Sequence, residues 1–257
     1  LVVVHMAGLP ADMQRIYQLS KRYGFSVIED ACHALGALYQ EKPVGNCQYS
    51  EVTVFSFHPV KAITSGEGGM AVTNDGQLAQ KMRLFAGHGV SRDPQQMTKK
   101  PDGDWYYQQI ALGYNYRLSD IHAALGLSQL KRLDEFIQKR RAIASVYDKA
   151  LELLPFQTPL YSQDRLSAFH LYIVALDSEV GVNRKQMFEE LRRQDVGVNV
   201  HYIPVHLQPY YQGLGFKAGD FPVAESYYEN ALTLPCFPDL ETDEQNFVIE
   251  ALSDSLS

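Results

Sequence analysis

Apolar and polar residues in the first half of the chain follow two different periods, one typical of strands and one typical of helices. Residues 1–4 are all apolar, which predicts a buried strand. Residues 12–23 carry apolar side chains at every third or fourth position, which predicts an amphipathic helix, and Gly24 predicts its end. The same reasoning predicts strands at 25–29, 51–57 and 69–73 and helices at 78–85 and 119–154.

Strands that alternate with helices in this way predict an α/β fold, with a mostly parallel sheet covered by helices on both faces. The second half of the chain predicts a smaller α+β domain. Its expected elements are strands at 167–176 and 196–205 and helices at 184–193, 221–233 and 242–255. We expect the boundary along the long helix before Pro155, so that the large domain covers 1–135 and the small domain covers 136–257.

Composition and charge narrow the class of protein. The chain is 46% hydrophobic and 21% charged, which is ordinary for a soluble globular protein. Its net charge of -7 disfavours a general nucleic-acid binder, because such proteins are normally basic. The three widely spaced cysteines favour a reducing cytoplasm over a disulfide framework. Neither a long apolar run nor a signal peptide is visible, so no membrane span is expected.

Residues that suit one particular cofactor follow two of the expected strands. Asp30 lies at the end of the strand 25–29, and ligands of open α/β sheets bind at that edge. Lys61 follows the strand 51–57, with the hydroxyl of Ser56 five residues before it and a glycine-rich stretch at 64–69 after it. Pyridoxal phosphate (PLP) needs a lysine for an imine, an acid for its ring nitrogen and donors for its phosphate.

Each of these residues alone favours an ordinary structural role. An aspartate at a strand end is more often a cap or turn residue, and a lysine beside glycines is usually solvated. The combination of Asp30, Ser56 and Lys61 at this spacing, with each residue next to an expected strand, favours the cofactor site.

The chain resembles the DegT/DnrJ-type sugar aminotransferases, a family of PLP enzymes of fold type I. The resemblance covers essentially the whole chain and is greatest to the UDP-4-keto-sugar aminotransferases of pseudaminic acid synthesis. Besides residues 29–69, the segments that carry it are GYNYRLS at 113–119, HYIPVH at 201–206, PYY at 209–211, AE at 224–225 and LTLP at 232–235.

The resemblance implies roles for five residues. Lys61 would bind PLP as a Schiff base and then act as the base that moves protons. Asp30 would pair with the pyridinium nitrogen, His33 would lie near the phenolic oxygen, and Ser56 would bind the phosphate. Asn115 would reach the phosphate of PLP in a partner subunit, which implies a homodimer with shared active sites.

The same resemblance suggests residues that contact the substrate. Arg117 is a candidate for the nucleotide diphosphate, because a guanidinium group can bind phosphate through two hydrogen bonds. His201, Tyr202 and His206 are candidates for contacts with the substrate, although packing within a strand explains them equally well.

The reaction implied by the resemblance is a two-stage transamination. An amino donor, glutamate, leaves its amino group on the cofactor, and the amine then passes to the 4-keto group of a nucleotide-linked deoxysugar. Relatives that act as sugar dehydratases have histidine in place of the lysine, so Lys61 favours transamination. A nicotinamide enzyme is disfavoured, because no Gly-x-Gly-x-x-Gly motif follows a strand.

The start of the chain leaves a further alternative open, namely a non-catalytic remnant that only folds or associates. The chain opens at Leu1 inside an apolar run, and a natural amino terminus rarely begins in a core strand. Family members carry, upstream of this point, a loop that binds the cofactor phosphate and an aromatic residue stacked on its ring. We therefore expect a truncated large domain, and for residues 1–257 alone little bound PLP, negligible transaminase activity and a non-standard oligomer.

Overall fold

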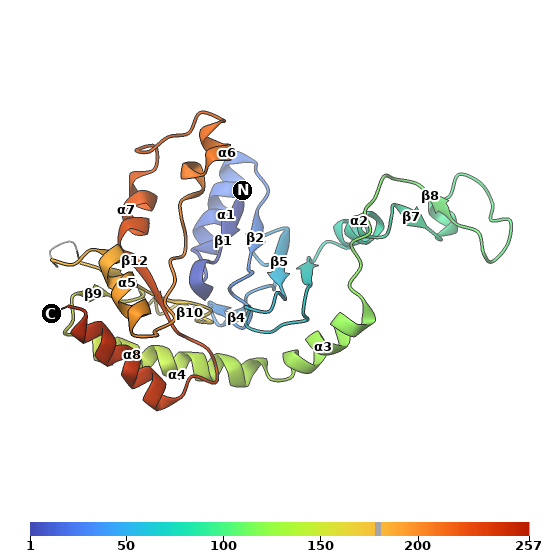
Figure 1. The fold of residues 1–257 in the computed structure, drawn as a ribbon. Coiled ribbons are helices and arrows are strands. Elements are labelled where there is room, and N and C mark those ends of the chain that lie inside the picture. Colours follow the sequence, from blue (N-terminus) through green and yellow to red (C-terminus); the bar gives the residue numbers. More distant parts are fainter. Residues whose placement is uncertain (178–180, 257) are drawn as a thin grey trace.

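A four-stranded sheet in the order β1–β2–β5–β6 forms the centre of the amino-terminal half of the computed structural model, which describes residues 1–177 and 181–256 (Figure 1). Its strands are β1 (Val2–Val4), β2 (Ile28–Asp30), β5 (Val52–Ser56) and β6 (Gly69–Val72). The first three strands run parallel, and β6 pairs antiparallel with β5. The α/β fold with a mostly parallel sheet is therefore confirmed.

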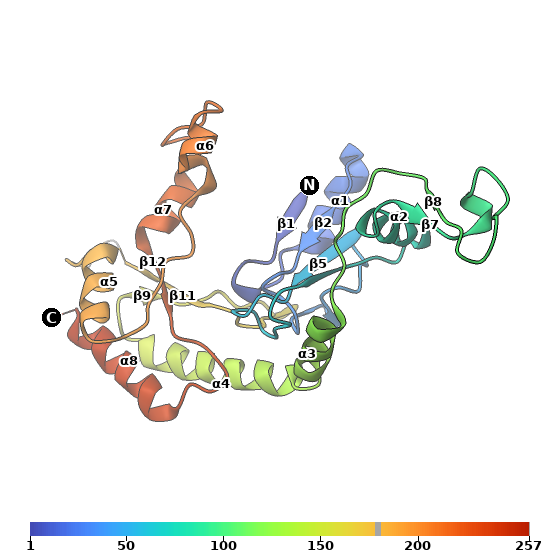
Figure 2. The ribbon, with the colours of Figure 1, turned by 45° about the vertical axis from the view of Figure 1, so that its right-hand side comes forward.

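Helix α1 (Met13–Tyr23) begins and ends where the sequence predicts, and it lies beside β1 and β2 (Figure 2). The side chain of Asp12 accepts a hydrogen bond from a backbone N–H of the first turn, and Gly24 ends the helix with a left-handed φ of 71°. Met13 is fully buried and shares a core cluster with Val3 of β1. This packing fixes the helix on one face of the sheet.

An arm formed by residues 87–118 follows α2 (Gly76–Ala86) and projects from the rest of the molecule in two views (Figures 1 and 2). The arm contains the hairpin of β7 (Val90–Ser91) and β8 (Gln108–Gln109) and the 3-10 turn η2 (Pro94–Gln96).

Residues 119–154 form two helices, so the single long helix expected there was wrong. These are α3 (Asp120–Leu130) and α4 (Leu133–Leu151). Neither glycine nor proline lies at the break, so packing decides it: α3 has no buried residue, whereas α4 buries Ile137 in one core cluster and Tyr147 in another. Because α4 contributes to both clusters, a domain boundary at residue 135 stays a prediction.

The carboxy-terminal half is built on an antiparallel sheet in the order β12–β11–β9. Buried residues of α4, α5 and α8 form its core with the sheet, as expected for a smaller α+β unit. The elements are β9 (Phe156–Gln157), β11 (Tyr172–Leu176), β12 (Ala231–Leu234), α5 (Arg184–Arg193) and α8 (Thr242–Asp254).

For two strands expected in this half, the predicted length was wrong. The strand expected at 167–176 begins only at Tyr172, because the residues before it turn against the amino-terminal half instead of pairing with a strand. The strand expected at 196–205 is reduced to one bridge at Asn199. Pro204 cannot donate a backbone hydrogen bond, so this segment cannot extend the sheet.

The helix expected at 221–233 was also too long. Helix α7 (Pro222–Asn230) ends at Asn230, and the next four residues form β12. All four are buried and pair with β11, and a short, continuously buried run is typical of an inner strand.

The remaining elements are short, and three of them form a small sheet of their own in the order β10–β3–β4. They are β3 (Leu38–Tyr39), β4 (Lys42–Pro43), β10 (Arg165–Leu166), the 3-10 turns η1 (Met6–Gly8) and η3 (Val205–Leu207), and α6 (Pro209–Gln212). Strand β10 pairs with β3 and so joins the two halves of the chain. Among the described helices, none is both long enough and apolar enough to span a bilayer.

Candidate active site

Asp30 lies where the carboxyl ends of β1, β2 and β5 meet at one edge of the sheet. Backbone hydrogen bonds hold this edge together, because His5 N–H donates to Asp30 O at 3.0 Å and Ala31 N–H donates to Val54 O at 2.8 Å. The side-chain Oδ1 of Asp30 accepts a hydrogen bond from the backbone N–H of Cys32 at 3.1 Å. A half-buried, oriented carboxylate therefore stands at the edge where open α/β sheets bind ligands.

Lys61 lies on the loop that leaves β5 and returns to β6. Phe57 N–H donates to Gly68 O at 2.9 Å and closes the base of the loop, and Lys61 N–H donates to His58 O at 2.9 Å. A Cβ atom on Gly68 would lie 2.5 Å from Oγ of Ser65, so this turn requires glycine. The glycine-rich stretch thus gives the loop its shape, and Lys61 is half-buried within it.

The pKa shifts at the site show which charged groups lie near one another. Burial first, and then the positive charge of Lys61, lower the pKa of His33 to about 4. The same two causes lower the pKa of His201. Burial and then Asp30 raise the pKa of the Cys32 thiol to about 11. The structure therefore brings Lys61 together with Asp30 and His33, and it keeps the histidines neutral and the thiol protonated at neutral pH.

His33 is buried between two other rings. Its Nε2 lies 3.4 Å from the hydroxyl oxygen of Tyr202, and its ring centroid lies 4.4 Å from that of His170. Its Nδ1 is buried and has no hydrogen-bond partner among the described residues. Leaving such a nitrogen unpaired costs about 1–3 kcal/mol, so this atom suits a bond to a ligand.

His201 and Tyr202 approach the site from the carboxy-terminal half. Nδ1 of His201 lies 2.8 Å from Oγ1 of Thr233 on β12, which fixes the ring. Tyr202 is exposed, but its hydroxyl reaches His33. The structure thus places both residues beside the cofactor candidates, and their contact with a substrate stays a prediction.

Ser56 and His206 each have a contact within the chain. Oγ of Ser56, at the end of β5, accepts a hydrogen bond from His58 N–H at 3.4 Å. Nε2 of the buried His206 lies 2.7 Å from Oε1 of Glu225, and that oxygen also accepts from Gly219 N–H at 2.9 Å. His206 is therefore held in a local network that shapes the loop before α7. Phosphate binding by Ser56 and substrate binding by His206 stay predictions.

Asn115 and Arg117 lie on the arm and are exposed. Asn115 forms an isolated backbone bridge with Gly87. Within residues 1–177 and 181–256, neither side chain forms a hydrogen bond or ion pair with Asp30 or Lys61. The structure does not bring them into this chain's own site, so their predicted roles require another subunit or a ligand.

His170 is not among the site residues that the sequence predicts. This residue is buried directly before β11, and its ring lies against that of His33. Burial, followed by His33 and Lys61, lowers its pKa to about 2, so it is neutral at physiological pH. The available signal was a histidine just before an apolar stretch, which is too common to indicate a site.

The residues at this edge of the sheet offer the chemical groups that PLP needs. A carboxylate is available for a protonated ring nitrogen, a half-buried amine for covalent attachment, and an unpaired imidazole nitrogen for an oxygen of the ring. Ser56 places a hydroxyl at the end of the neighbouring strand. The fit rests above all on the buried Nδ1 of His33, which finds no partner among the described residues.

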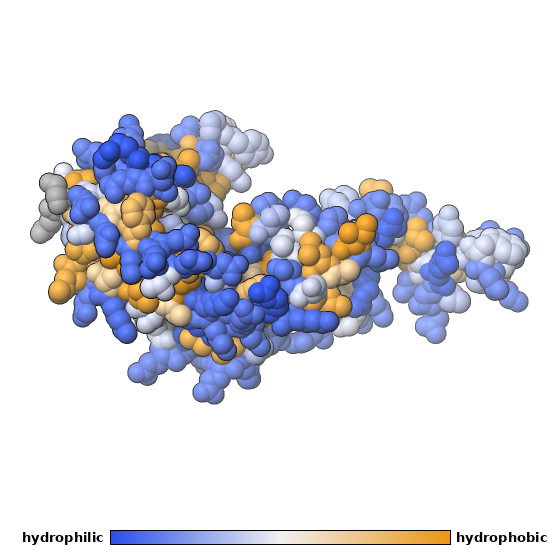
Figure 3. Space-filling model, turned by 60° about the horizontal axis from the view of Figure 1, so that its bottom comes forward, coloured by the Kyte–Doolittle hydropathy of each residue, from blue (hydrophilic) through white to orange (hydrophobic). Residues whose placement is uncertain are grey.

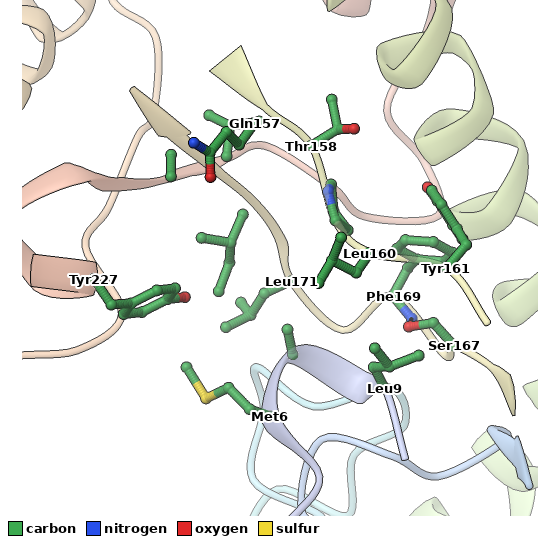
Figure 4. Close-up of a pocket in the computed structure, with 15 residues that line it drawn as sticks. Met6, Leu9, Gln157, Thr158, Leu160, Tyr161, Ser167, Phe169, Leu171 and Tyr227 are labelled. Atoms are coloured by element: carbon green, nitrogen blue, oxygen red, sulfur yellow. Dashed lines mark hydrogen bonds between the residues drawn. The ribbon is translucent and has the colours of Figure 1, made fainter. Parts of the chain in front are cut away.

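An apolar cavity of about 320 Å³ lies elsewhere, between η1 and the segment after β9 (Figure 4). Met6, Leu9, Leu160, Leu171 and Tyr227 are among the residues that line it. Its lining includes neither Asp30 nor Lys61. An almost wholly apolar wall offers little to a phosphate, so this cavity is not the cofactor site.

The profile of the DegT/DnrJ/EryC1/StrS aminotransferase family matches residues 1–253. The chain belongs to this family. Aminotransferases of this family depend on PLP, which confirms the cofactor that Asp30 and Lys61 predict. Solved structures that are similar to this chain over nearly its whole length are fold type I enzymes, which confirms the predicted fold class.

Three relatives show how far the similarity extends. SpsC, a spore coat polysaccharide biosynthesis protein of Bacillus subtilis, is 39% identical over 99% of this chain and 66% of its own length. The UDP-4-amino-4,6-dideoxy-N-acetyl-beta-L-altrosamine transaminase of Campylobacter jejuni is 38% identical over 97% of this chain and 64% of its own. The structure of Helicobacter pylori PseC, an aminotransferase of pseudaminic acid biosynthesis, is 32% identical with a TM-score of 0.90 and covers 99% of this chain. The chain spans about two thirds of the length of these relatives.

Proposed function

We propose that this chain carries the catalytic core of a PLP-dependent aminotransferase. The reaction moves an amino group from an amino acid, glutamate, to the 4-keto group of a nucleotide-linked deoxysugar. The observation that carries the proposal is the geometry at the carboxyl edge of the sheet, where β2, which ends at Asp30, pairs parallel with β5, which leads into the loop of Lys61. The substrate class is supported by the relative from Campylobacter jejuni, which is named for a UDP-linked 4-amino-4,6-dideoxy sugar. Free cysteines favour a cytoplasmic location.

Each residue at the site has a distinct task in this proposal. PLP, when bound, supplies an electron sink for the carbon that gains and loses a proton. Lys61 would hold the cofactor covalently, and its Nζ would carry that proton. The carboxylate of Asp30, whose Oδ1 is oriented by the N–H of Cys32, keeps the ring nitrogen protonated. His33 offers its unpaired Nδ1 to the ring oxygen.

Adding PLP and an amino donor to the protein tests the proposed function. At excess PLP, which offsets the weak cofactor binding expected for residues 1–257 alone, we expect an absorption band of covalently attached PLP that glutamate converts to the pyridoxamine form and a 4-keto nucleotide sugar restores. A panel of UDP- and dTDP-linked 4-keto sugars then identifies the acceptor. A dehydrated sugar as product would point to a sugar dehydratase instead, and the absence of any band at excess PLP would point to a non-catalytic remnant.

We also propose a homodimer in which the arm completes the partner's active site. Apolar side chains on the arm and α3 are unusually exposed: Leu112 is 88%, Ile121 is 83% and Tyr116 is 74% exposed. Figure 3 shows apolar surface gathered between the arm and the rest of the molecule. Large exposed apolar patches mark interaction surfaces, and Asn115, on the same arm, has no contact with its own Lys61 among the described residues.

Mixing two inactive variants tests the shared site. Lys61→Ala removes the covalent attachment, and Asn115→Asp places a negative charge against the phosphate. If Asn115 serves the partner, each mixed dimer holds one intact site. An equal mixture that exchanges subunits should then recover about one quarter of the activity of the original protein, because random pairing makes half of the dimers mixed.

Two results would contradict this arrangement. Light scattering that shows an active monomer would exclude the shared site. A mixture that exchanges subunits and stays inactive would show that Asn115 serves its own subunit. The matched control is Gln95→Glu, which adds the same charge to an exposed position on the arm and should leave activity unchanged.

A further inference from the structure

The turn before β11 is held in a strained conformation. Phe169 has a φ of +46°, and Ala7, which faces this turn, has a φ of +58°. Two backbone hydrogen bonds join the two segments: Ala168 N–H donates to Gly8 O at 3.0 Å, and Leu171 N–H donates to Ala7 O at 3.2 Å. Left-handed conformations cost residues other than glycine about 1–3 kcal/mol, persist only where the surroundings enforce them, and cluster at functional sites.

A buried arginine enforces the position of this turn. Nη1 of Arg140, on α4, donates hydrogen bonds to the carbonyl oxygens of Phe169 at 3.1 Å and of His170 at 3.2 Å. Gly8 allows the close approach, because a Cβ atom there would lie 2.9 Å from His33 O and 3.1 Å from His170 N. Removing the charge of an arginine from water costs free energy of folding. The buried Arg140 therefore indicates that the position of this turn is important.

The consequence of this placement is the contact between His170 and His33. The ring centroids are 4.4 Å apart and the ring planes are inclined by 48°. Nδ1 of His170, like that of His33, is buried and unpaired among the described residues. The charged or titratable groups that face the two rings are Lys61, Asp30, His201, Arg140 and the hydroxyl of Tyr202.

We propose that His170 is a positioning residue, whose ring packs against that of His33 and holds it, shielded from water, as a partner for the cofactor. The proposal rests on the proposed role of His33 at PLP. His170 acts through shape and exclusion of water, because its own nitrogen has no bond to His33. An aromatic ring without titratable nitrogens should therefore replace it, whereas a small side chain should not.

The test measures His33 directly, in protein without cofactor. Histidines labelled with ¹⁵N are titrated by NMR, and the His33 signal is assigned by its loss in His33→Gln. In His170→Ala, water reaches the ring, and the pKa of His33 should rise by at least about one unit towards the ordinary value of about 6.5. In His170→Phe, the pKa of His33 should stay low.

Binding of PLP should follow the same order, with affinity reduced in His170→Ala and recovered in His170→Phe. An unchanged pKa in His170→Ala, or an equal rise in both variants, would overturn the proposal. If His170→Ala does not fold, His170→Gln takes its place, because its flexible side chain cannot cover the ring. His88→Asn, at an exposed histidine on the arm, is the control and should leave His33 unchanged. Because the titration needs no turnover, its outcome is independent of the proposed reaction.

Discussion

Replacing Lys61 by alanine is expected to abolish the absorption band of covalently attached PLP and to lower turnover by at least about 10⁴-fold. Lys61 lies half-buried on the loop between β5 and β6, and its charge acts on His33 and His201. Among the residues that the structure describes, no other lysine lies between a strand of this sheet and a glycine-rich turn. Spectra and single-turnover rates are measured at excess PLP, so that weak binding does not hide the effect.

Two further variants show whether the effect is specific to the amine. Lys61→Arg keeps the positive charge but cannot form the covalent bond, so it should be as inactive as the alanine variant. Lys81→Ala, at an exposed position on α2, should behave like the original protein. A Lys61→Ala protein that borohydride still links to PLP at the active site would show that another amine binds the cofactor.

The second large effect is expected for Asp30→Asn, which should lower the rate by roughly 10²–10⁴-fold while covalent attachment of PLP persists. The amide has the shape of the carboxylate and can still accept the hydrogen bond of Cys32 N–H. It cannot hold a proton on the ring nitrogen by charge, and loss of one partner of a buried ion pair costs about 3–5 kcal/mol. The loss should appear in the proton-transfer step, measured by single-turnover kinetics.

The control for this substitution is Asp102→Asn, on the exposed arm, which removes the same charge far from the sheet edge and should not change the rate. Unchanged turnover in Asp30→Asn would remove this carboxylate from the mechanism. A protein that no longer attaches PLP at all would show instead that Asp30 is needed for binding rather than for the chemical step.

The sequence predicted those parts of the fold that depend on residues close to one another along the chain. Asp12 and Gly24 mark the two ends of α1, because a cap and a left-handed glycine act within one turn of the helix. The strand that becomes β5 was likewise predicted from the sequence, over residues 51–57. By contrast, the break between α3 and α4 has no local signal, because it results from the way α4 packs Ile137 and Tyr147 into two different clusters.

The candidate active site likewise has a part that the sequence predicted and a part that only packing decided. The sequence by itself determined the local chemistry, since Asp30 and Lys61 each follow a strand and parallel strands end at a common edge. Only the tertiary structure decided what surrounds them. Tyr202 and His170 reach His33 from distant segments of the chain, and no local pattern predicts which distant side chains packing will bring together. The strained turn at Phe169 is likewise a product of that packing, because backbone contacts with residues 7–8 and hydrogen bonds from the buried Arg140 hold it.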